Sequence, residues 1–322
     1  MNRRDLLTRA ALLAGGLGGA WWLRDNVLWR DPAVSFGPDG TSGWVPYDAP
    51  RAATPTALVT IAGQTVRALI DSGAQYSVID SGLFDALGLT RALDLPLVAY
   101  GVGGGAQMGR GTTLQIALGD MRIADLRAAI LALGPLAMRE GLSAPLILGQ
   151  DVLGEAVLEL DTAGRRLRFH SRSDHVLPSN VLPVVVGKSR GALETEVTVE
   201  GARVRAVIDT GASALIALGR GTAQDAGLLD GRPVRRGSSI VLGGAIASQL
   251  VRARTVTVGD QLYRDVETAI YADVALPGFP RALVGMEAFE GRRLVIDLGG
   301  TALHTSRPMD LDVLPRRGRG TA

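Results

Sequence analysis

Short hydrophobic runs with strand-forming side chains, broken by turn residues, follow one another along most of this chain. Residues 57–62 and 65–70 are two such runs on either side of Gly63, which is the pattern of a β-hairpin. Gly119-Asp120 and Gly259-Asp260 mark two further hairpin turns. The pattern therefore predicts a protein built mostly of strands. Short helices are expected at residues 81–87 and 220–228.

The chain contains an internal repeat. Residues 63–74 recur as residues 201–212, and residues 146–153 recur as residues 282–289. Between the two motifs of each copy lies a glycine-rich segment. Three matches in the same order at a nearly constant offset indicate a duplication.

The duplication predicts two homologous lobes with short flanking segments. The boundary between the lobes falls near residues 171–183, where Ser, Asp, Asn and Pro cluster and the periodicity stops. The expected segments are an N-terminal segment at 1–20, a linker or leading strand at 21–54, lobes at 55–175 and 183–310, and a basic tail at 311–322.

Composition narrows the chemistry. The 322 residues include no Cys and only three His, which excludes thiol nucleophiles, disulfides and cysteine-ligated zinc. We expect neither a metal nor a cofactor. Arg3, Arg4 and Arg9 against Asp5 account for the whole net charge of +2. The rest of the chain has no basic excess, so we do not expect nucleic acid as a partner.

The N-terminus resembles a twin-arginine export signal. Arg3-Arg4 is followed by Leu6-Leu7 and by an uncharged stretch, residues 10–23, that ends in a tryptophan pair. This pattern predicts export to the periplasm, and any membrane contact would involve residues 1–23 alone. An uncleaved signal acting as an anchor and an ordinary amphipathic helix are the alternatives. No uncharged apolar run reaches the ~20 residues that a membrane-spanning helix needs.

The repeated motif carries the candidate chemistry. In each copy a hydrophobic strand leads to an aspartate, Asp71 or Asp209, and the glycine two residues later allows a sharp turn. The intervening hydroxyls of Ser72 and Thr210 can form hydrogen bonds to the loop of the other copy. Phosphoryl-transfer enzymes also use an Asp-Thr-Gly loop, but on an α/β fold with further acidic and lysine residues. This chain is rich in strands, and Lys188 is its only lysine.

On these motifs the chain resembles the retropepsin-like aspartic proteases, with two copies fused in one polypeptide over residues 55–170 and 190–305. The resemblance implies an all-β, bilobal acid-protease fold of two closed β lobes with a few short helices. It also implies an aspartic endopeptidase that acts as a monomer on an extended peptide or protein substrate. The Gly73-Ala74 and Gly211-Ala212 pairs follow the retroviral pattern, because pepsin-like enzymes usually have Ser after the glycine.

The resemblance assigns roles to three groups of residues. The implied catalytic pair is Asp71 and Asp209. The implied supporting loop residues are Ser72, Gly73, Thr210 and Gly211. The implied substrate-binding flaps contain Gly103, Gly104, Gly105, Gly243 and Gly244.

Other interpretations of the same residues remain open. The fold could serve as an inactive peptide-binding or scaffolding module, or the two aspartates could be structural turn residues. Asp151 and Glu287 are expected to cap short helices rather than to assist catalysis. His170 and His304, each at the end of a strand, are expected at the surface.

Overall fold

The computed structural model describes residues 30–49, 52–89, 92–100, 106–138, 142–241, 244–274 and 279–307. The expected export signal, the basic tail at 311–322, and the flap glycines Gly103, Gly104, Gly105 and Gly243 lie outside these residues. Within them, no helix is long and apolar enough to cross a membrane.

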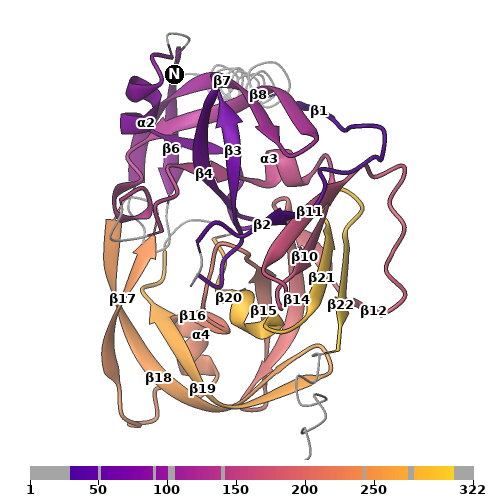
Figure 1. Ribbon diagram of the computed structural model, residues 1–322. Coiled ribbons are helices and arrows are strands. Elements are labelled where there is room, and N and C mark those ends of the chain that lie inside the picture. The colour runs from indigo at the N-terminus through magenta and orange to yellow at the C-terminus, as the bar shows by residue number, and fades with distance from the viewer. Residues whose placement is uncertain are drawn as a thin grey trace, which may run out of the picture.

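The N-terminal lobe is a closed β barrel, drawn in the upper part of Figure 1. Six strands follow one another around it in the order β8-β5-β9-β4-β3-β7, and the pairing of β7 with β8 closes the ring. The elements of this lobe are β3 (Thr56–Ile61), β4 (Gln64–Ile70), β5 (Val78–Asp80), α2 (Ser81–Ala86), β6 (Ala92–Tyr100), β7 (Ala106–Leu118), β8 (Met121–Leu131), η2 (Gly134–Leu136), β9 (Leu146–Leu148) and α3 (Gln150–Leu153).

The C-terminal lobe repeats this construction. Its six strands run β14-β15-β20-β16-β19-β18, and the pairing of β14 with β18 closes the ring. Its elements are β13 (Gly187–Ser189), β14 (Ala192–Val199), β15 (Ala202–Ile208), β16 (Ile216–Gly219), α4 (Arg220–Asp225), β17 (Arg235–Val241), β18 (Gly244–Val258), β19 (Gln261–Tyr271), β20 (Ala282–Val284) and η3 (Met286–Phe289). The predicted all-β, bilobal fold is confirmed.

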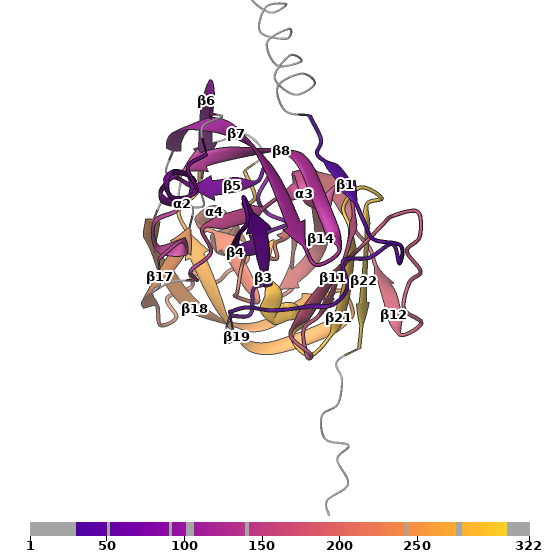
Figure 2. The same ribbon diagram turned by 45° about the horizontal axis from the view of Figure 1, so that its top comes forward.

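A six-stranded interlobe sheet joins the two barrels, and Figure 2 shows it from another side. At its centre a strand of the first lobe pairs antiparallel with a strand of the second, so that Leu160 lies opposite Leu294. The order is β12 (Val181–Val184), β22 (Ala302–Ser306), β21 (Arg293–Asp297), β10 (Val157–Asp161), β11 (Arg166–His170) and β2 (Val45–Pro46). The remaining strand, β1 (Ala33–Ser35), pairs with β8.

The backbone preserves the duplication in detail. Non-glycine residues with positive φ are uncommon, because the left-handed region is unfavourable for a side chain with a Cβ. Six of the eight such residues in the described part of the chain form matching pairs: Ala62 with Glu200, Asp125 with Asp265, and Arg165 with Thr301. Each pair occupies the same turn or strand position in its lobe, so the two halves share their local conformations as well as their topology.

The expectation that His170 lies at the surface is wrong. His170 is buried in the interlobe sheet, where its Nε2 forms a hydrogen bond of 2.8 Å with the carboxylate of Glu159. Arg168 donates to the same carboxylate oxygen at 2.6 Å. Burial alone would raise the pKa of Glu159, but the hydrogen bonds from His170 and Arg168 lower it to about 2. A buried carboxylate requires hydrogen-bond partners, and His170 is buried because it is one of the partners of Glu159.

Candidate active site

The two aspartate loops are held by the strands beneath them. In the first lobe β4 runs parallel to β9, and the N–H of Asp71 donates to the carbonyl of Leu148 at 2.9 Å. In the second lobe β15 runs parallel to β20, and the N–H of Asp209 donates to the carbonyl of Val284 at 2.9 Å. Each aspartate therefore leaves the sheet at a position that the repeated apolar-apolar-glycine segment determines.

Each loop turns back on its own carboxylate. The Oδ1 atom of Asp71 accepts hydrogen bonds from the N–H groups of Gly73 at 2.8 Å and Ala74 at 3.1 Å. Asp209 accepts the equivalent bonds from the N–H groups of Gly211 at 2.8 Å and Ala212 at 3.2 Å. Two backbone donors thus orient each carboxyl group without using any other side chain.

Four hydrogen bonds tie the two loops together. The Thr210 hydroxyl donates to the carbonyl of Ile70 at 2.7 Å and accepts from the N–H of Ser72 at 2.9 Å. The Ser72 hydroxyl donates to the carbonyl of Ile208 at 2.8 Å and accepts from the N–H of Thr210 at 3.0 Å. Both hydroxyls are buried. The predicted cross-loop bonding is confirmed, and it holds the two lobes in register at the site.

The two carboxyl groups lie against each other. The side chains of Asp71 and Asp209 share a hydrogen bond. A Cβ at Gly211 would come within 2.6 Å of the Asp71 carboxyl carbon, and a Cβ at Gly73 would come within 2.7 Å of the Asp209 carboxyl carbon. Any side chain at either glycine would displace the opposite carboxyl group. The two glycines are therefore required for the pair to form.

The pair holds a proton at a pH where isolated carboxyl groups do not. Burial raises the pKa of Asp209 well above its ordinary value, and the neighbouring charge of Asp71 raises it further. Burial also raises the pKa of Asp71, while the N–H of Gly73 and the hydrogen bond from Asp209 act in the opposite direction. The two carboxyl groups thus share one proton, and the two titration steps belong to the pair rather than to either residue.

The acidic residues after the apolar-apolar-glycine segments contact distant backbone groups, although Asp151 also accepts the N–H of Val152 in its own short helix at 2.9 Å. Asp151 accepts hydrogen bonds from the N–H of Ser77 at 2.8 Å and from its hydroxyl at 2.7 Å. Glu287 accepts from the N–H of Leu215 at 3.0 Å. Both carboxylates therefore fasten the segment after an aspartate loop to the segment beneath it. A cap at this position is a local interaction, whereas Ser77 and Leu215 are distant in sequence from their partners.

Sequence reasoning missed one residue of the site, Gln150. Its side-chain amide donates to the carbonyl of Ser72 at 2.9 Å. The corresponding residue of the second lobe is Met286, which has no side-chain donor for such a bond. The repeat aligns these two positions, but a difference within a repeat does not itself reveal which copy makes the contact.

The predicted flaps are described only in part. Gly244 opens β18, whose pairing with β17 runs from Arg235 opposite Leu250 to Val241 opposite Gly244. η2 of the N-terminal lobe contacts both strands of this hairpin. The second flap hairpin therefore extends across to the other lobe (Figure 1). In the described part of the chain, no three His, Cys, Asp or Glu residues are grouped so that they could hold a metal ion.

A family model described as "Aspartyl protease" matches the chain twice, over residues 57–152 and 195–288. UBA domain-containing protein Mud1 of Schizosaccharomyces pombe is 29% identical over 127 residues, which is 39% of this chain and 36% of Mud1. The chain thus spans about a third of the length of that curated relative.

Three solved structures that are similar to this chain have low sequence identity to it. Basic 7S globulin from soybean is 11% identical with a TM-score of 0.43, covering 82% of this chain and 94% of its own. Conglutin gamma from lupine seeds is 12% identical with a TM-score of 0.43, covering 82% and 93%. A retropepsin-like aspartic protease from Rickettsia conorii is 22% identical with a TM-score of 0.30, covering 39% and 89%.

Proposed function

Because the chain belongs to the aspartyl protease family, with one match in each of its two lobes, we propose that it is an aspartic endopeptidase. The observation that carries the proposal is the pair of carboxyl groups, Asp71 and Asp209, held against each other by four hydrogen bonds between the lobes. A pair of structural turn aspartates would have no need of this arrangement.

The chemistry follows from the shared proton. Two adjacent carboxyl groups do not readily ionise together, so between the two titration steps of the pair one is charged and the other is protonated. The charged member of the pair serves as the general base and takes a proton from a bound water. The protonated member donates a hydrogen bond to the carbonyl oxygen of the scissile peptide bond. The water oxygen then attacks the carbonyl carbon, and the proton taken from the water later passes to the leaving amine.

The substrate in this proposal is an extended stretch of polypeptide. The β17–β18 hairpin reaches across to the N-terminal lobe, where both of its strands contact η2. An extended peptide bound below such a hairpin can form hydrogen bonds as an additional strand. Both aspartate loops belong to one chain, so the proposed active form is the monomer.

The test replaces each member of the pair. Asp71→Asn and Asp209→Asn should each abolish cleavage of an unfolded protein substrate, because either change removes the shared ionisable proton. Asp125→Asn is the matched control, since Asp125 is an exposed aspartate at positive φ, where Asn is tolerated. Full activity in either folded variant would refute the proposed catalytic pair. An unaltered protein that binds extended peptides but cleaves none would instead establish the peptide-binding module.

The same assay has an expected pH dependence. The pair must carry one proton and one charge, so the rate should follow a bell-shaped curve on the acidic side of neutral pH. Ala74 and Ala212 lack the hydroxyl that would favour the charged form in a pepsin-like enzyme, so the optimum should be less acidic than for such an enzyme. An alkaline optimum would contradict the mechanism.

A further inference from the structure

The two lobes differ at one pair of equivalent turns. In the N-terminal lobe the turn at Gly119 and Asp120 is covered, because the N–H of Asp120 donates to the carbonyl of Ser42 at 3.1 Å. A Cβ at Gly119 would collide with that same carbonyl. In the C-terminal lobe a Cβ at Gly259 would meet nothing within 4 Å. Among the residues that the structure describes, none covers the second turn as Ser42 covers the first.

The strands that follow these turns differ in the same way. β1 pairs antiparallel with the start of β8, with Val34 opposite Ile123, and Met121 and Ile123 are fully buried. The equivalent residues of β19 are Gln261 and Tyr263, which are only half-buried and line a pocket of about 460 Å³. In the described part of the chain, no strand pairs with this edge at the start of β19.

The path of the chain explains the open edge. β2 and β12 occupy equivalent places in the interlobe sheet, since Val45 pairs with Leu167 and Val184 pairs with Leu303. The segment before β2 covers the first turn. The segment before β12 runs to the N-terminal lobe instead, where the N–H of Ser171 donates to the carbonyl of Gly40 at 2.8 Å. It links the lobes and so cannot also cover β19.

The pocket beside this edge is mostly apolar. Val185 is 90% exposed and Leu182 is 49% exposed, although both belong to the pocket lining. Three of the polar side chains in the lining, those of Arg292, Gln261 and Tyr263, already have partners. Arg292 donates to the Gln261 side chain at 2.9 Å, and the Tyr263 hydroxyl donates to the carbonyl of Ala288 at 2.6 Å. The pocket therefore offers apolar surface, and the strand edge offers backbone hydrogen bonds.

We propose that the start of β19 and this pocket bind an extended segment of a partner protein, which adds to β19 as an antiparallel strand. The N-terminal lobe shows what kind of segment binds at the equivalent edge, the start of β8. There β1 is extended and antiparallel, and Val34 and Phe36 pack against the core at alternate positions. The partner segment accordingly carries apolar side chains at alternate positions. Strand addition to an exposed edge is a general mode of peptide recognition. The inference does not depend on the proposed proteolysis.

The experiment uses the full chain carrying Asp209→Asn, so that bound peptide is not cut. The probe is a synthetic peptide with the sequence of residues 31–40, which fills the equivalent place in the first lobe. The control peptide has Ser in place of the residues corresponding to Val34 and Phe36. We expect saturable binding of the probe alone, measured by fluorescence anisotropy. Hydrogen exchange should slow at residues 261–265 and stay unchanged at residues 121–125, which are already covered.

A charge in the pocket provides the decisive variant. Val185→Glu should weaken probe binding by roughly tenfold or more, because it places a charge against apolar surface. Val176→Glu should leave binding unchanged, since Val176 is 84% exposed and lies outside the pocket lining. Absence of saturable binding, or binding that Val185→Glu leaves unaltered, overturns the proposal. Equal protection from hydrogen exchange at residues 261–265 and 121–125 in the free protein would also overturn it, because the protein's own residues would then cover the edge of β19.

Discussion

At the scale of single residues, the hydroxyl of Thr210 links the two aspartate loops through two hydrogen bonds. Thr210→Val keeps the shape but removes the bond to the Ile70 carbonyl and the acceptor for the Ser72 N–H. Both groups would then be buried without a partner, which should lower the free energy of unfolding by about 1–3 kcal/mol. The catalytic rate should also fall, because the two loops that position the carboxyl groups lose hydrogen bonds between them.

Urea unfolding and the rate of peptide cleavage measure the two effects. Thr198→Val is the control, since Thr198 is half-buried in β14, away from the aspartate loops. A Thr210→Val protein with the stability and rate of the unaltered protein would show that the cross-loop bonds do not align the site.

Asp151 should make the stability depend on pH. Burial raises its pKa to about 6, although its hydrogen bonds with Ser77 act in the opposite direction. In the unfolded chain an aspartate releases its proton near pH 3.9. Between about pH 4 and pH 6 the folded state thus binds more protons, so Asp151 makes stability fall as the pH rises through this range.

Asp151→Asn is neutral at every pH and should remove this contribution. Relative to the unaltered protein, the variant should gain on the order of 1–3 kcal/mol between pH 4 and pH 7, since one unit of pKa shift corresponds to about 1.4 kcal/mol. Unfolding in urea at the two pH values measures the difference. The Asp71 and Asp209 pair contributes a dependence of the same sign, but it is present in both proteins and cancels. Parallel pH profiles would contradict the prediction.

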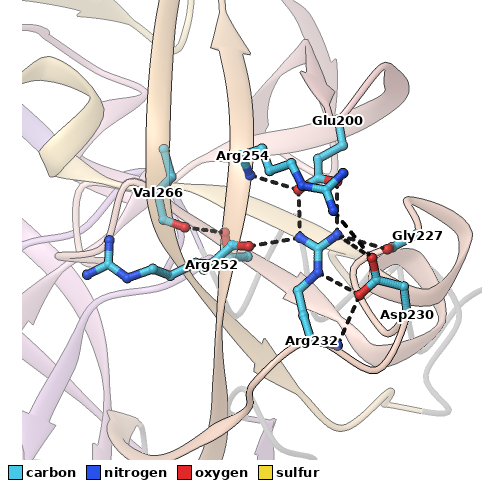
Figure 3. A network of polar contacts seen from close by, with 8 residues as sticks. Glu200, Gly227, Asp230, Arg232, Arg252, Arg254 and Val266 are labelled. Atoms are coloured by element: carbon cyan, nitrogen blue, oxygen red, sulfur yellow. Dashed lines mark hydrogen bonds and ion pairs between the residues drawn. The ribbon is translucent and has the colours of Figure 1, made fainter.

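At the scale of elements, a single arginine fastens the base of the β17–β18 hairpin. Arg232 lies three residues before β17, and its guanidinium donates to both carboxylate oxygens of Glu200, at 2.6 and 3.0 Å (Figure 3). It also donates to Asp230 at 2.8 Å and to the carbonyl of Arg252 at 2.8 Å. These contacts join the β14–β15 turn, the loop after α4, and β18.

Arg232→Met should therefore loosen the hairpin. It leaves Glu200, a largely buried carboxylate, without its bidentate partner. We expect a loss of roughly 2–3 kcal/mol in unfolding free energy, below the 3–5 kcal/mol typical of a fully buried pair. Hydrogen exchange in β17 should also be faster. The control is Arg252→Met, whose pair with Asp265 is solvent-exposed and should contribute less than about 1 kcal/mol. Equal effects of the two substitutions would refute the assignment.

At the scale of the whole molecule, the interlobe sheet joins the two lobes, so that aspartate loops from distant parts of one chain lie together in one site. β10 and β21 pair across the boundary, and the Thr162 hydroxyl donates to the carbonyl of Phe289 at 2.8 Å. Each molecule therefore carries a complete pair of aspartates.

A mixing experiment follows from this architecture. Full-length Asp71→Asn and Asp209→Asn proteins, each inactive, should stay inactive when combined, because neither molecule lends a loop to the other. The specific activity of the unaltered protein should also be independent of its concentration. Activity that appears on mixing, or that rises with concentration, would contradict the monomeric site.

The features predicted correctly from the sequence are those with local causes. The hairpin around Gly63 and the helices after the aspartate loops follow from residue patterns within a few positions of one another. The duplication follows from comparing such local patterns between the two halves of the chain. The Asp-Ser/Thr-Gly loops are recognisable because the carboxylate, the hydroxyl that bonds to the other loop and the glycine of the turn are adjacent in sequence. Through the family resemblance that these motifs carry, the sequence predicts two closed β lobes and Asp71 and Asp209 as a candidate pair.

The remaining features depend on contacts between residues far apart in the chain, and only the tertiary structure decided them. The burial of His170 follows from a carboxylate that the interlobe sheet encloses. The two lobes even place one helix-capping aspartate differently: Asp80 caps α2 from its own N-terminus, whereas Gly221 in α4 donates to Asp273 from a distant segment. The open edge of β19 likewise follows from the path of the linking segment. Residue patterns determine local conformation, but which groups become buried together depends on how the two lobes pack.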